Sequence, residues 1–353
     1  MTPRAGTSMP RRRLGRTSVE VGILGFGGAT IGGIGAQVTE AQAQATLDAA
    51  WDAGLRYFDT APWYGRGVSE LRVGRLLREK PPDQFVISTK VGRILRSPAN
   101  MAAFDGSPWH GGGPFEVQFD YSYDGILRAY EDSLQRLGLA RIHLAIVHDL
   151  DLGYHAPQAR WDAMMAQLIT GGWRALAELR SAGVIGGIGV GINSRGLIPR
   201  FLELFDLDFF LLAGRYTLME QETLMDELPA CVERGVGIVI GAVFGSGLLA
   251  TGPVPGARYD YREPTPAQIE QVTRIKAICD RYGVPLAAAA LQFPLAHPAV
   301  ASVIPGPVSA AQVQSNVQAV HHPIPGNLWR DLKAAGLVRE DAPTPARKMV
   351  HTS

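Results

Sequence analysis

The sequence is poor in cysteine, in long apolar runs and in charge of one sign. Its two cysteines, Cys231 and Cys279, are too few for a disulfide framework or a cysteine-based zinc site, and no metal is expected. No apolar run is long enough to span a bilayer, and the first ten residues lack the apolar core of a secretion signal. Lys and Arg (34) balance Asp and Glu (33), which argues against nucleic acid as the main partner. We therefore expect a cytoplasmic protein that does not act on membranes.

Short apolar runs alternate with longer segments of helical periodicity along the chain. Eight runs rich in Val and Ile are expected as strands: Val21–Phe26, Arg56–Phe58, Phe85–Thr89, Ile142–Val147, Ile185–Val190, Phe209–Leu212, Gly237–Ile240 and Ala301–Ile304. Helices are expected at Glu40–Ala53, Ser69–Arg78, Tyr123–Arg136, Trp161–Ser181, Ser194–Leu204, Gln221–Arg234, Pro266–Tyr282 and Ala310–Gln318. This alternation predicts an α/β protein with a parallel sheet covered by helices.

Eight strand–helix units favour a closed (β/α)8 TIM barrel. The alternative is an open doubly wound sheet, which needs a glycine fingerprint at the start of the first helix. The glycine-rich segment 26–33 fits that role poorly, because the first helix is expected to begin only at Glu40.

We expect one barrel domain over residues 11–338, with disordered tails at 1–10 and 339–353. Two long loops interrupt the pattern, Val91–Ser122 after the third strand and Thr251–Pro264 after the seventh. Loops of this length inside a compact domain are usually functional. The first of them follows Lys90 directly, so it is expected to lie over the mouth of the barrel.

Ionisable side chains follow three consecutive predicted strands. Asp59 ends the second strand and Tyr64 comes five residues later, Lys90 follows the third strand, and His148 follows the fourth. The carboxyl ends of the strands of a parallel barrel converge on one mouth, where active sites lie. The sequence therefore predicts that these four side chains form one site.

The four residue types suit proton transfer at a carbon–oxygen bond. A free tyrosine titrates near pH 10, so exchange of its proton near neutral pH calls for a lower pKa, which the ammonium of Lys90 is expected to provide. Asp59 is expected to hold Lys90 charged and in place. His148 either positions the reacting oxygen by a hydrogen bond or relays the proton. The combination predicts hydride transfer coupled to proton transfer.

These motifs together resemble those of the aldo-keto reductases. The resemblance covers about residues 11–320 and is carried by Arg13-Leu14-Gly15-Arg16-Thr17, by Asp59 with Tyr64, by Lys90, by His148, and by Ile304-Pro305-Gly306 with Asn316. It implies a (β/α)8 barrel that binds an extended nicotinamide cofactor without a Rossmann domain. It also implies that Asp59, Tyr64, Lys90 and His148 are the catalytic tetrad.

The resemblance further implies which residues contact the cofactor and the substrate. The cofactor set is Gly28, Ala29, Asn193, Arg215, Phe244, Gly245, Ser246, Gly247, Leu248, Gly306, Val308, Gln312 and Asn316, and the substrate set is Trp63, Trp109 and His110. The chain departs from the family pattern at Ala213, where many members have Gln, and Arg215 is expected to compensate. The aromatic residue that stacks on nicotinamide in many members is absent around Gly241-Ala242, and Phe244 is expected to substitute.

The segment after the eighth strand carries no basic residue between Ile304 and Asn316. In NADP-dependent members of the family, basic residues follow the eighth strand, and Arg or Lys normally pairs with the 2′-phosphate of NADP. The resemblance together with this segment therefore implies NAD as the cofactor. Arg258 and Arg262 on the loop after the seventh strand leave NADP open.

The pattern is most similar to the family branch that oxidises aldoses at C1 or pyridoxal at C4. We expect an NAD-dependent oxidation of a sugar C1 hydroxyl to the lactone. The alternatives are oxidation of pyridoxal, an NADP-dependent aldehyde reductase, and a cofactor-binding regulatory subunit. The sequence leaves open the exact sugar or aldehyde, the direction of the reaction and the oligomeric state.

Overall fold

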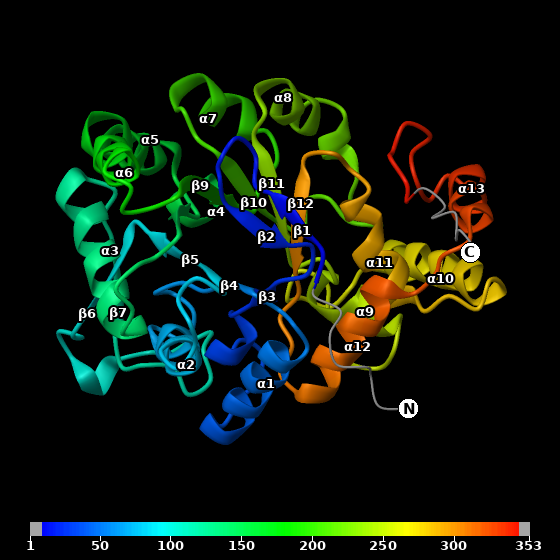
Figure 1. Ribbon diagram of the computed structural model, residues 1–353, viewed down its shortest axis with the longest axis horizontal. Coiled ribbons are helices and arrows are strands. Elements are labelled where there is room, and N and C mark those ends of the chain that lie inside the picture. The colour runs from blue at the N-terminus through cyan, green and yellow to red at the C-terminus, as the bar shows by residue number, and fades with distance from the viewer. Residues whose placement is uncertain (1–8, 346–353) are drawn as a thin grey trace.

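The computed structural model describes residues 9–345 and contains an eight-stranded parallel sheet curled into a barrel (Figure 1). In sheet order its strands are β12 (Val300–Ile304), β11 (Gly237–Gly241), β10 (Phe209–Ala213), β9 (Gly187–Ile192), β8 (Leu144–His148), β5 (Val86–Val91), β4 (Tyr57–Asp59) and β3 (Phe26–Gly27). Every strand therefore lies beside its neighbour in the chain, apart from the hairpin strands inserted in the loops. The predicted (β/α)8 barrel is confirmed.

Backbone hydrogen bonds between the first and last barrel strands close the sheet. Val303 N–H donates to Ile23 O, Gly25 N–H to Val303 O and Gly27 N–H to Pro305 O, each at 2.9 Å. A closed ring has no free edge, and because its strands are parallel, all of their carboxyl ends open at one mouth.

Helices surround the barrel on the outside (Figure 1). They are α1 (Glu40–Asp52), α2 (Val68–Leu77), α3 (Tyr123–Leu137), α4 (Leu152–His155), α5 (Gln158–Gln167), α6 (Trp173–Ser181), α7 (Ile198–Leu204), α8 (Glu227–Arg234), α9 (Leu248–Thr251), α10 (Pro266–Arg281), α11 (Leu286–Leu295), α12 (Ala310–His321) and α13 (Gly326–Ala334). Side-chain caps mark several starts, such as Ser122 for α3 and the Thr265–Gln268 capping box of α10.

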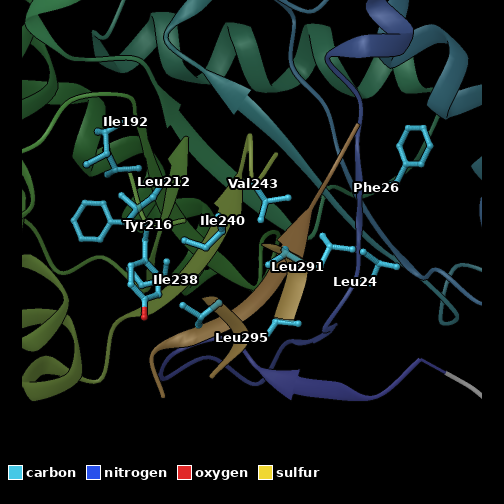
Figure 2. Packing of buried hydrophobic residues seen from close by; sticks show 14 of the residues in the cluster. Leu24, Phe26, Ile192, Leu212, Tyr216, Ile238, Ile240, Val243, Leu291 and Leu295 are labelled. Atoms are coloured by element: carbon cyan, nitrogen blue, oxygen red, sulfur yellow. The ribbon is translucent and has the colours of Figure 1, made fainter. Parts of the chain in front are cut away.

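Alternation along the strands sorts the core into two layers. One cluster fills the barrel and includes Tyr57, Leu144, Ile146 and Phe209. The intervening residues pack between the strands and the helices, and Figure 2 shows Leu291 and Leu295 of α11 among them. Successive residues of a strand point to opposite faces. Asp59 lies two residues after Tyr57, and His148 lies two residues after Ile146, so both side chains also point into the barrel. Lys90 of β5 points inward in the same way and pairs with Asp59.

The structure corrects several predicted elements. The predicted strand Val21–Phe26 is divided, because β2 (Glu20–Gly22) pairs with β1 (Arg11–Arg13) in an antiparallel hairpin, whereas Leu24 bridges to Val303 of β12 and Phe26–Gly27 pairs with β4 in the barrel. The predicted helix Trp161–Ser181 begins earlier and contains a π-helical turn at Leu168–Gly172. The predicted loop Val91–Ser122 contains a hairpin of β6 (Arg93–Arg96) and β7 (Glu116–Phe119).

Helices α11 and α13 were not expected from the sequence. Nearly every residue of α11 is apolar, so it shows no periodic pattern, and it packs against α9 and α12. Of the tails predicted to be disordered, residues 1–8 and 346–353 lie outside the described residues. The described ends pack against the barrel: Met9 is buried, Ala342 is buried, and Arg339 N–H donates to Gln221 Oε1 at 2.7 Å.

Both cysteines are buried and free, as small apolar residues would be, and burial raises the pKa of Cys231 to about 12 and that of Cys279 to about 11. Within residues 9–345, no helix has the length and apolar character needed to cross a membrane.

The carboxylate of Glu70 joins three elements next to the mouth. It is fully buried on α2 and accepts hydrogen bonds from Thr89 Oγ1 of β5 at 2.6 Å and from Arg136 Nε of α3 at 2.5 Å. A buried charge that loses its partner is strongly destabilising.

We therefore expect Glu70→Ala to lower the free energy of unfolding by about 3 kcal/mol, measured by urea denaturation at pH 7. Arg128→Ala is the control, since it removes an exposed Arg128–Asp132 pair on the same helix α3 and should cost no more than about 0.5 kcal/mol. Similar losses in the two variants would show that the Glu70 contacts do not stabilise the fold.

Candidate active site

Three neighbouring strands bring Asp59, Lys90 and His148 to one end of the barrel. β4 pairs with β5 and β5 with β8, and Asp59 and His148 are the last residues of their strands while Lys90 is the last but one of its strand. All three side chains are at most 3% exposed. The strand register thus places an acid, an amine and an imidazole together, as the sequence predicts.

A buried ion pair forms the floor of the site. Lys90 Nζ donates to Asp59 Oδ2 at 2.7 Å and to the backbone oxygen of Thr60 at 2.8 Å. Ser88 Oγ donates to the other carboxylate oxygen of Asp59, also at 2.7 Å. Burial raises the pKa of Asp59, while the Lys90 ammonium opposes this rise. With these partners both charges are hydrogen-bonded, which is the condition for keeping ions in a protein interior.

Tyr64 lies above this pair on the turn after β4. The ammonium nitrogen of Lys90 is 4.4 Å from the centre of the Tyr64 ring, and the ring is nearly perpendicular to that of His148 at a centroid distance of 5.7 Å. Gly28 allows the turn to approach, because a Cβ there would lie 2.7 Å from Asp59 O and 2.6 Å from Ser69 Oγ. The structure thus brings all four predicted tetrad residues together.

The pKa of Tyr64 does not shift in the expected direction. It is raised well above its ordinary value, because burial disfavours the tyrosinate and the carboxylates of Asp59 and Asp149 add to this effect. The pKa of His148 is well below its usual range, because the ring is buried and Arg93 and Lys90 oppose a further positive charge. At neutral pH the mouth therefore holds a protonated phenol and a neutral imidazole.

Asp149 and Arg93 were missed from the sequence. The Arg93 guanidinium donates to Asp149 Oδ2, and Asn193 Nδ2 donates to Asp149 Oδ1 at 2.7 Å. Asp149 directly follows His148, and the polar sequence after that strand is the signal that would have drawn attention to it. Arg93 gave no such signal, because its segment reads as part of a long loop.

Residues 97–115, between β6 and β7, cover one side of the mouth, and we call them the covering segment. The Trp109 ring lies 5.4 Å from the ring of Trp63 and 5.9 Å from that of Tyr64, so two of the three predicted substrate residues border the tetrad. His110 is exposed, and the contact it makes here runs through its backbone, whose N–H donates to Gly33 O at 3.0 Å. Gly33 has φ +95°, and a Cβ there would lie 2.3 Å from His110 O.

Arg66 ties this segment to the turn that carries Tyr64. Its guanidinium donates to the backbone oxygens of Phe115 at 2.5 Å, Asp105 at 2.9 Å and Ser107 at 3.0 Å. A cavity of about 370 Å³ adjoins it, and of the described residues its lining includes Trp63 and Arg66 but none of the tetrad. The cavity is therefore separate from the cluster of Asp59, Tyr64, Lys90 and His148.

The predicted cofactor residues that follow β9 and β10, Asn193 and Arg215, contact each other. Asn193 Nδ2 donates to Asp149 and, at 3.3 Å, to Asp151 Oδ2, which leaves its carbonyl oxygen Oδ1 to accept from a ligand. Arg215 Nε donates to Asn193 O at 2.6 Å, and Arg215 Nη2 pairs with Asp260 Oδ2 at 2.8 Å. Arg215 is thus engaged on both sides within the protein.

The glycine turn after β11 lies under the loop 251–264. Ser246 Oγ accepts from Tyr261 N–H at 2.9 Å, and Gly245 packs against the Tyr259 ring. No heavy atom of the described residues would come within 4 Å of a Cβ at Gly247, which has φ +111°. Phe244 is partly buried at the start of this turn, and Leu248 is buried and begins α9. The turn therefore has open space beside Gly247, which suits the close approach of a phosphate.

The remaining predicted cofactor residues lie where β12 runs into α12. Gln312 Oε1 accepts from Val308 N–H at 2.8 Å, and Gln42 Nε2 donates to Val308 O at 2.9 Å. Gly306 is exposed beside Thr30, next to Ala29 of the first βα loop, and Asn316 is half-buried on α12. Gly306 adjoins the first βα loop, since a Cβ at this position would lie 2.7 Å from Thr30 Oγ1 and 3.1 Å from Gly27 O.

Comparison with known proteins decides the family. Residues 23–336 match the aldo/keto reductase family. The chain belongs to that family. The aldo/keto reductases use nicotinamide cofactors and act on CH–OH or carbonyl groups of small molecules, so this chain is an oxidoreductase.

Two curated relatives come from the branch indicated by the sequence. The chain is 44% identical to the pyridoxal 4-dehydrogenase of Microbacterium luteolum, with 93% of this chain and 98% of the relative covered. It is 39% identical to the D-threo-aldose 1-dehydrogenase of a Pseudomonas species, with 91% and 95% covered. Among solved aldo/keto reductases, the holo form of an enzyme from Bacillus halodurans is 25% identical, with a TM-score of 0.71 and with 98% of this chain and 100% of that chain covered.

The Arg66 contacts predict how the covering segment behaves. Arg66→Asn should accelerate amide hydrogen exchange over residues 104–115, because three backbone oxygens lose their donor. Asn is suitable because position 66 has φ +51°, which Asn tolerates.

Arg96→Ala is the matched control, since it removes an exposed contact between Arg96 and Gln118 on the β6–β7 hairpin. It should leave exchange in residues 104–115 unchanged. Equal protection of this segment in wild type and Arg66→Asn would contradict the proposed role of Arg66.

Proposed function

We propose that the protein is an NAD-dependent dehydrogenase that oxidises a cyclic hemiacetal to a lactone, with an aldose oxidised at C1 as its first candidate substrate. The observation that carries the proposal is the cluster of Tyr64, Lys90, Asp59 and His148 at the mouth of the barrel. The two curated relatives support the substrate class. D-threo-aldoses close to hemiacetals at C1, and pyridoxal closes to a hemiacetal through its neighbouring hydroxymethyl group.

Each tetrad residue has a role that its geometry supports. The Tyr64 hydroxyl gives a proton to the carbonyl oxygen in reduction and becomes a tyrosinate, and the tyrosinate takes the hydroxyl proton in oxidation. Lys90, 4.4 Å from the ring, is the cation that favours the tyrosinate during that transfer. Asp59 holds Lys90, and His148 donates a hydrogen bond that orients the reacting oxygen. A bound nicotinamide would accept the hydride from the carbon.

Several residues present suit the cofactor. Asn193 Oδ1, oriented by Asp149 and Asp151, is an acceptor for the carboxamide N–H of nicotinamide. The open turn at Gly247 suits the pyrophosphate. Gly306, Val308, Gln312 and Asn316 would line the adenosine end, where neutral side chains suit a ribose with free hydroxyls better than a 2′-phosphate.

The covering segment favours a hydroxylated substrate. The indole N–H of Trp109 is buried and has no hydrogen-bond partner among residues 9–345, although its ring lies next to Tyr64 and Trp63. A buried donor is costly unless it is paired, and a substrate hydroxyl beside Tyr64 would pair it. The indole faces would cover the C–H side of a sugar.

Pyridoxal is the second candidate, favoured by the 44% identity to a pyridoxal 4-dehydrogenase. The same aromatic faces suit a pyridine ring, and the pyridoxal hydroxyls offer an acceptor for Trp109 N–H. The aldehyde-reductase and regulatory alternatives have less support, because the segment after β12 carries no basic residue and the tetrad is intact.

Initial rates with NAD test the function. Purified protein should reduce NAD in the presence of one or more of L-fucose, D-arabinose, L-galactose, L-glucose or pyridoxal, followed by the absorbance of reduced nicotinamide. Tyr64→Phe should lower kcat by about 100-fold or more, because it removes the proton-transfer group and little else. Phe115→Tyr is a control that makes the reverse change, adding a hydroxyl to an exposed ring of the covering segment, and it should leave kcat unchanged.

Activity with the sugars alone supports the aldose reading, and activity with pyridoxal alone supports the second candidate. Cofactor binding without turnover of any of the five in either direction would overturn the dehydrogenase proposal and favour a regulatory role.

Cofactor choice is tested by the ratio of kcat/KM for NAD and NADP. Wild type should prefer NAD, and Gln312→Arg should improve kcat/KM for NADP by about tenfold or more, the value of one charge-assisted pair. Gln318→Arg adds the same charge about 9 Å further along α12 and should not change the ratio. Preference of wild type for NADP would contradict the NAD assignment and direct attention to Arg258 and Arg262.

A further inference from the structure

Asp149 is a carboxylate at the mouth, outside the tetrad, that lies within contact distance of three polar side chains, those of Arg93, Asn193 and His148. Its side chain is buried, and it accepts from Arg93 and from Asn193 Nδ2 at 2.7 Å. His148 Nε2 lies 3.2 Å from Asp149 Oδ2. Asp149 therefore contacts both a tetrad residue and a residue that suits the cofactor.

Arg93 holds Asp149 in a fixed position. The guanidinium is 2% exposed and lies among three aromatic rings, at 5.0 Å from the centre of Trp63, 4.9 Å from Phe119 and 4.7 Å from Tyr154. Rings on several sides leave a cation few orientations and stabilise its charge. The guanidinium is thus kept directed at Asp149.

The backbone at this point is also fixed. Asp149 has φ +49°, a conformation in which Asp and Asn are the commonest residues after glycine. Its N–H donates to Gly191 O at 3.0 Å, and the oxygen of His148 accepts from Tyr121 OH at 2.7 Å. Both ends of the His148–Asp149 contact are therefore held by other parts of the barrel.

The contact determines which nitrogen of His148 carries the proton. A carboxylate 3.2 Å from Nε2 repels a lone pair on that nitrogen and stabilises the positive end of an Nε2–H bond. The pair does not have hydrogen-bond geometry, so the Nε2–H stays free to donate to the reacting oxygen. His148 Nδ1 has no hydrogen-bond partner among the described residues, so a proton there would be a buried donor without an acceptor. Both arguments favour the neutral Nε2–H form.

We propose that Asp149, fixed by Arg93 and Asn193, is a positioning residue that holds His148 in its Nε2–H tautomer. The imidazole is then a hydrogen-bond donor toward the reacting oxygen and not a proton acceptor. The inference deepens the proposed function and rests on it for its catalytic meaning, but the tautomer itself is independent of the substrate.

The charges around this contact give the proposal a pH signature. His148 is faced by Arg93, Lys90, Asp149 and the Tyr64 ring, and Asp149 is also near Asp151, Tyr154 and Tyr261. The Asp149 carboxylate raises the pKa of Tyr64, after the larger effects of burial and Asp59. Removing its charge therefore favours the tyrosinate, which is the form needed for oxidation.

The first test is the variant Asp149→Asn, which keeps the shape and tolerates the positive φ. With whichever substrate wild type oxidises, kcat should fall by about 10- to 100-fold, because the imidazole loses its fixed tautomer and orientation. The acidic limb of the pH profile of kcat/KM should move to lower pH, since the pKa of Tyr64 falls. A role confined to stability would not move that limb.

Asp151→Asn is the matched control. Asp151 is buried two residues away and also accepts from Asn193, with the backbone N–H at 3.0 Å, but it does not contact His148. In the Asp151→Asn variant we expect the KM for the cofactor to rise, while the acidic limb of the pH profile of kcat/KM stays at the same pH. The proposal would be overturned if Asp149→Asn left both kcat and the acidic limb of the pH profile unchanged. It would also be overturned if the acidic limb moved by the same amount in both variants.

The second test needs no variant to be active. Long-range ¹H–¹⁵N correlation spectra of protein labelled with ¹⁵N-histidine report the tautomer of each ring, and a His148→Gln spectrum assigns the His148 signals among the eight histidines. We expect a neutral Nε2–H ring between pH 6 and 8. An Nδ1–H or doubly protonated ring would overturn the inference even if the dehydrogenase activity is found. An Nε2–H ring in a protein that turns over none of the substrates would leave it standing while the proposed function fails.

Discussion

The buried ion pair between Lys90 and Asp59 is the contact on which the site depends. Neither charge is stable in the barrel interior by itself, and each is satisfied by the other together with Thr60 O or Ser88 Oγ. The pair requires β4 and β5 to be adjacent and in register, with Asp59 and Lys90 pointing inward near the ends of these strands. It therefore couples the adjacency of two barrel strands to the presence of a cation 4.4 Å from the centre of the Tyr64 ring.

A second set of polar contacts holds the covering segment and Asp149 next to the Lys90–Asp59 pair. Arg66 binds three backbone oxygens of the covering segment, and Arg93 lies within an aromatic cage and binds Asp149. Both arginines are almost completely buried, which is unusual unless their charge is compensated. The covering segment thus has a fixed position over the tetrad, and a predicted loop of 32 residues is an ordered part of the site.

The pKa of Tyr64 is raised, although the nearby Lys90 ammonium alone would lower it. One cation, Lys90, faces the Tyr64 ring, but burial and the carboxylates of Asp59 and Asp149 keep its phenol protonated. Tyr64 is therefore in its protonated, proton-donating form at neutral pH. An oxidised nicotinamide bound at the mouth would add positive charge there, and positive charge favours the tyrosinate.

Much of the fold and the tetrad followed from the sequence, because they depend on local patterns. Short apolar runs that alternate with periodic helices determine a (β/α)8 barrel, and period-two alternation turns Asp59, Lys90 and His148 inward at the strand ends. Helix α11 and the β6–β7 hairpin lacked such a pattern, the first because it is apolar throughout and the second because its strands are stabilised mainly by contacts with each other. The direction of the Tyr64 pKa shift, the aromatic cage of Arg93 and the partners of Asp149 were decided only by the tertiary structure. Each depends on burial and on charges brought together from distant parts of the chain, and neither quantity is encoded in local sequence.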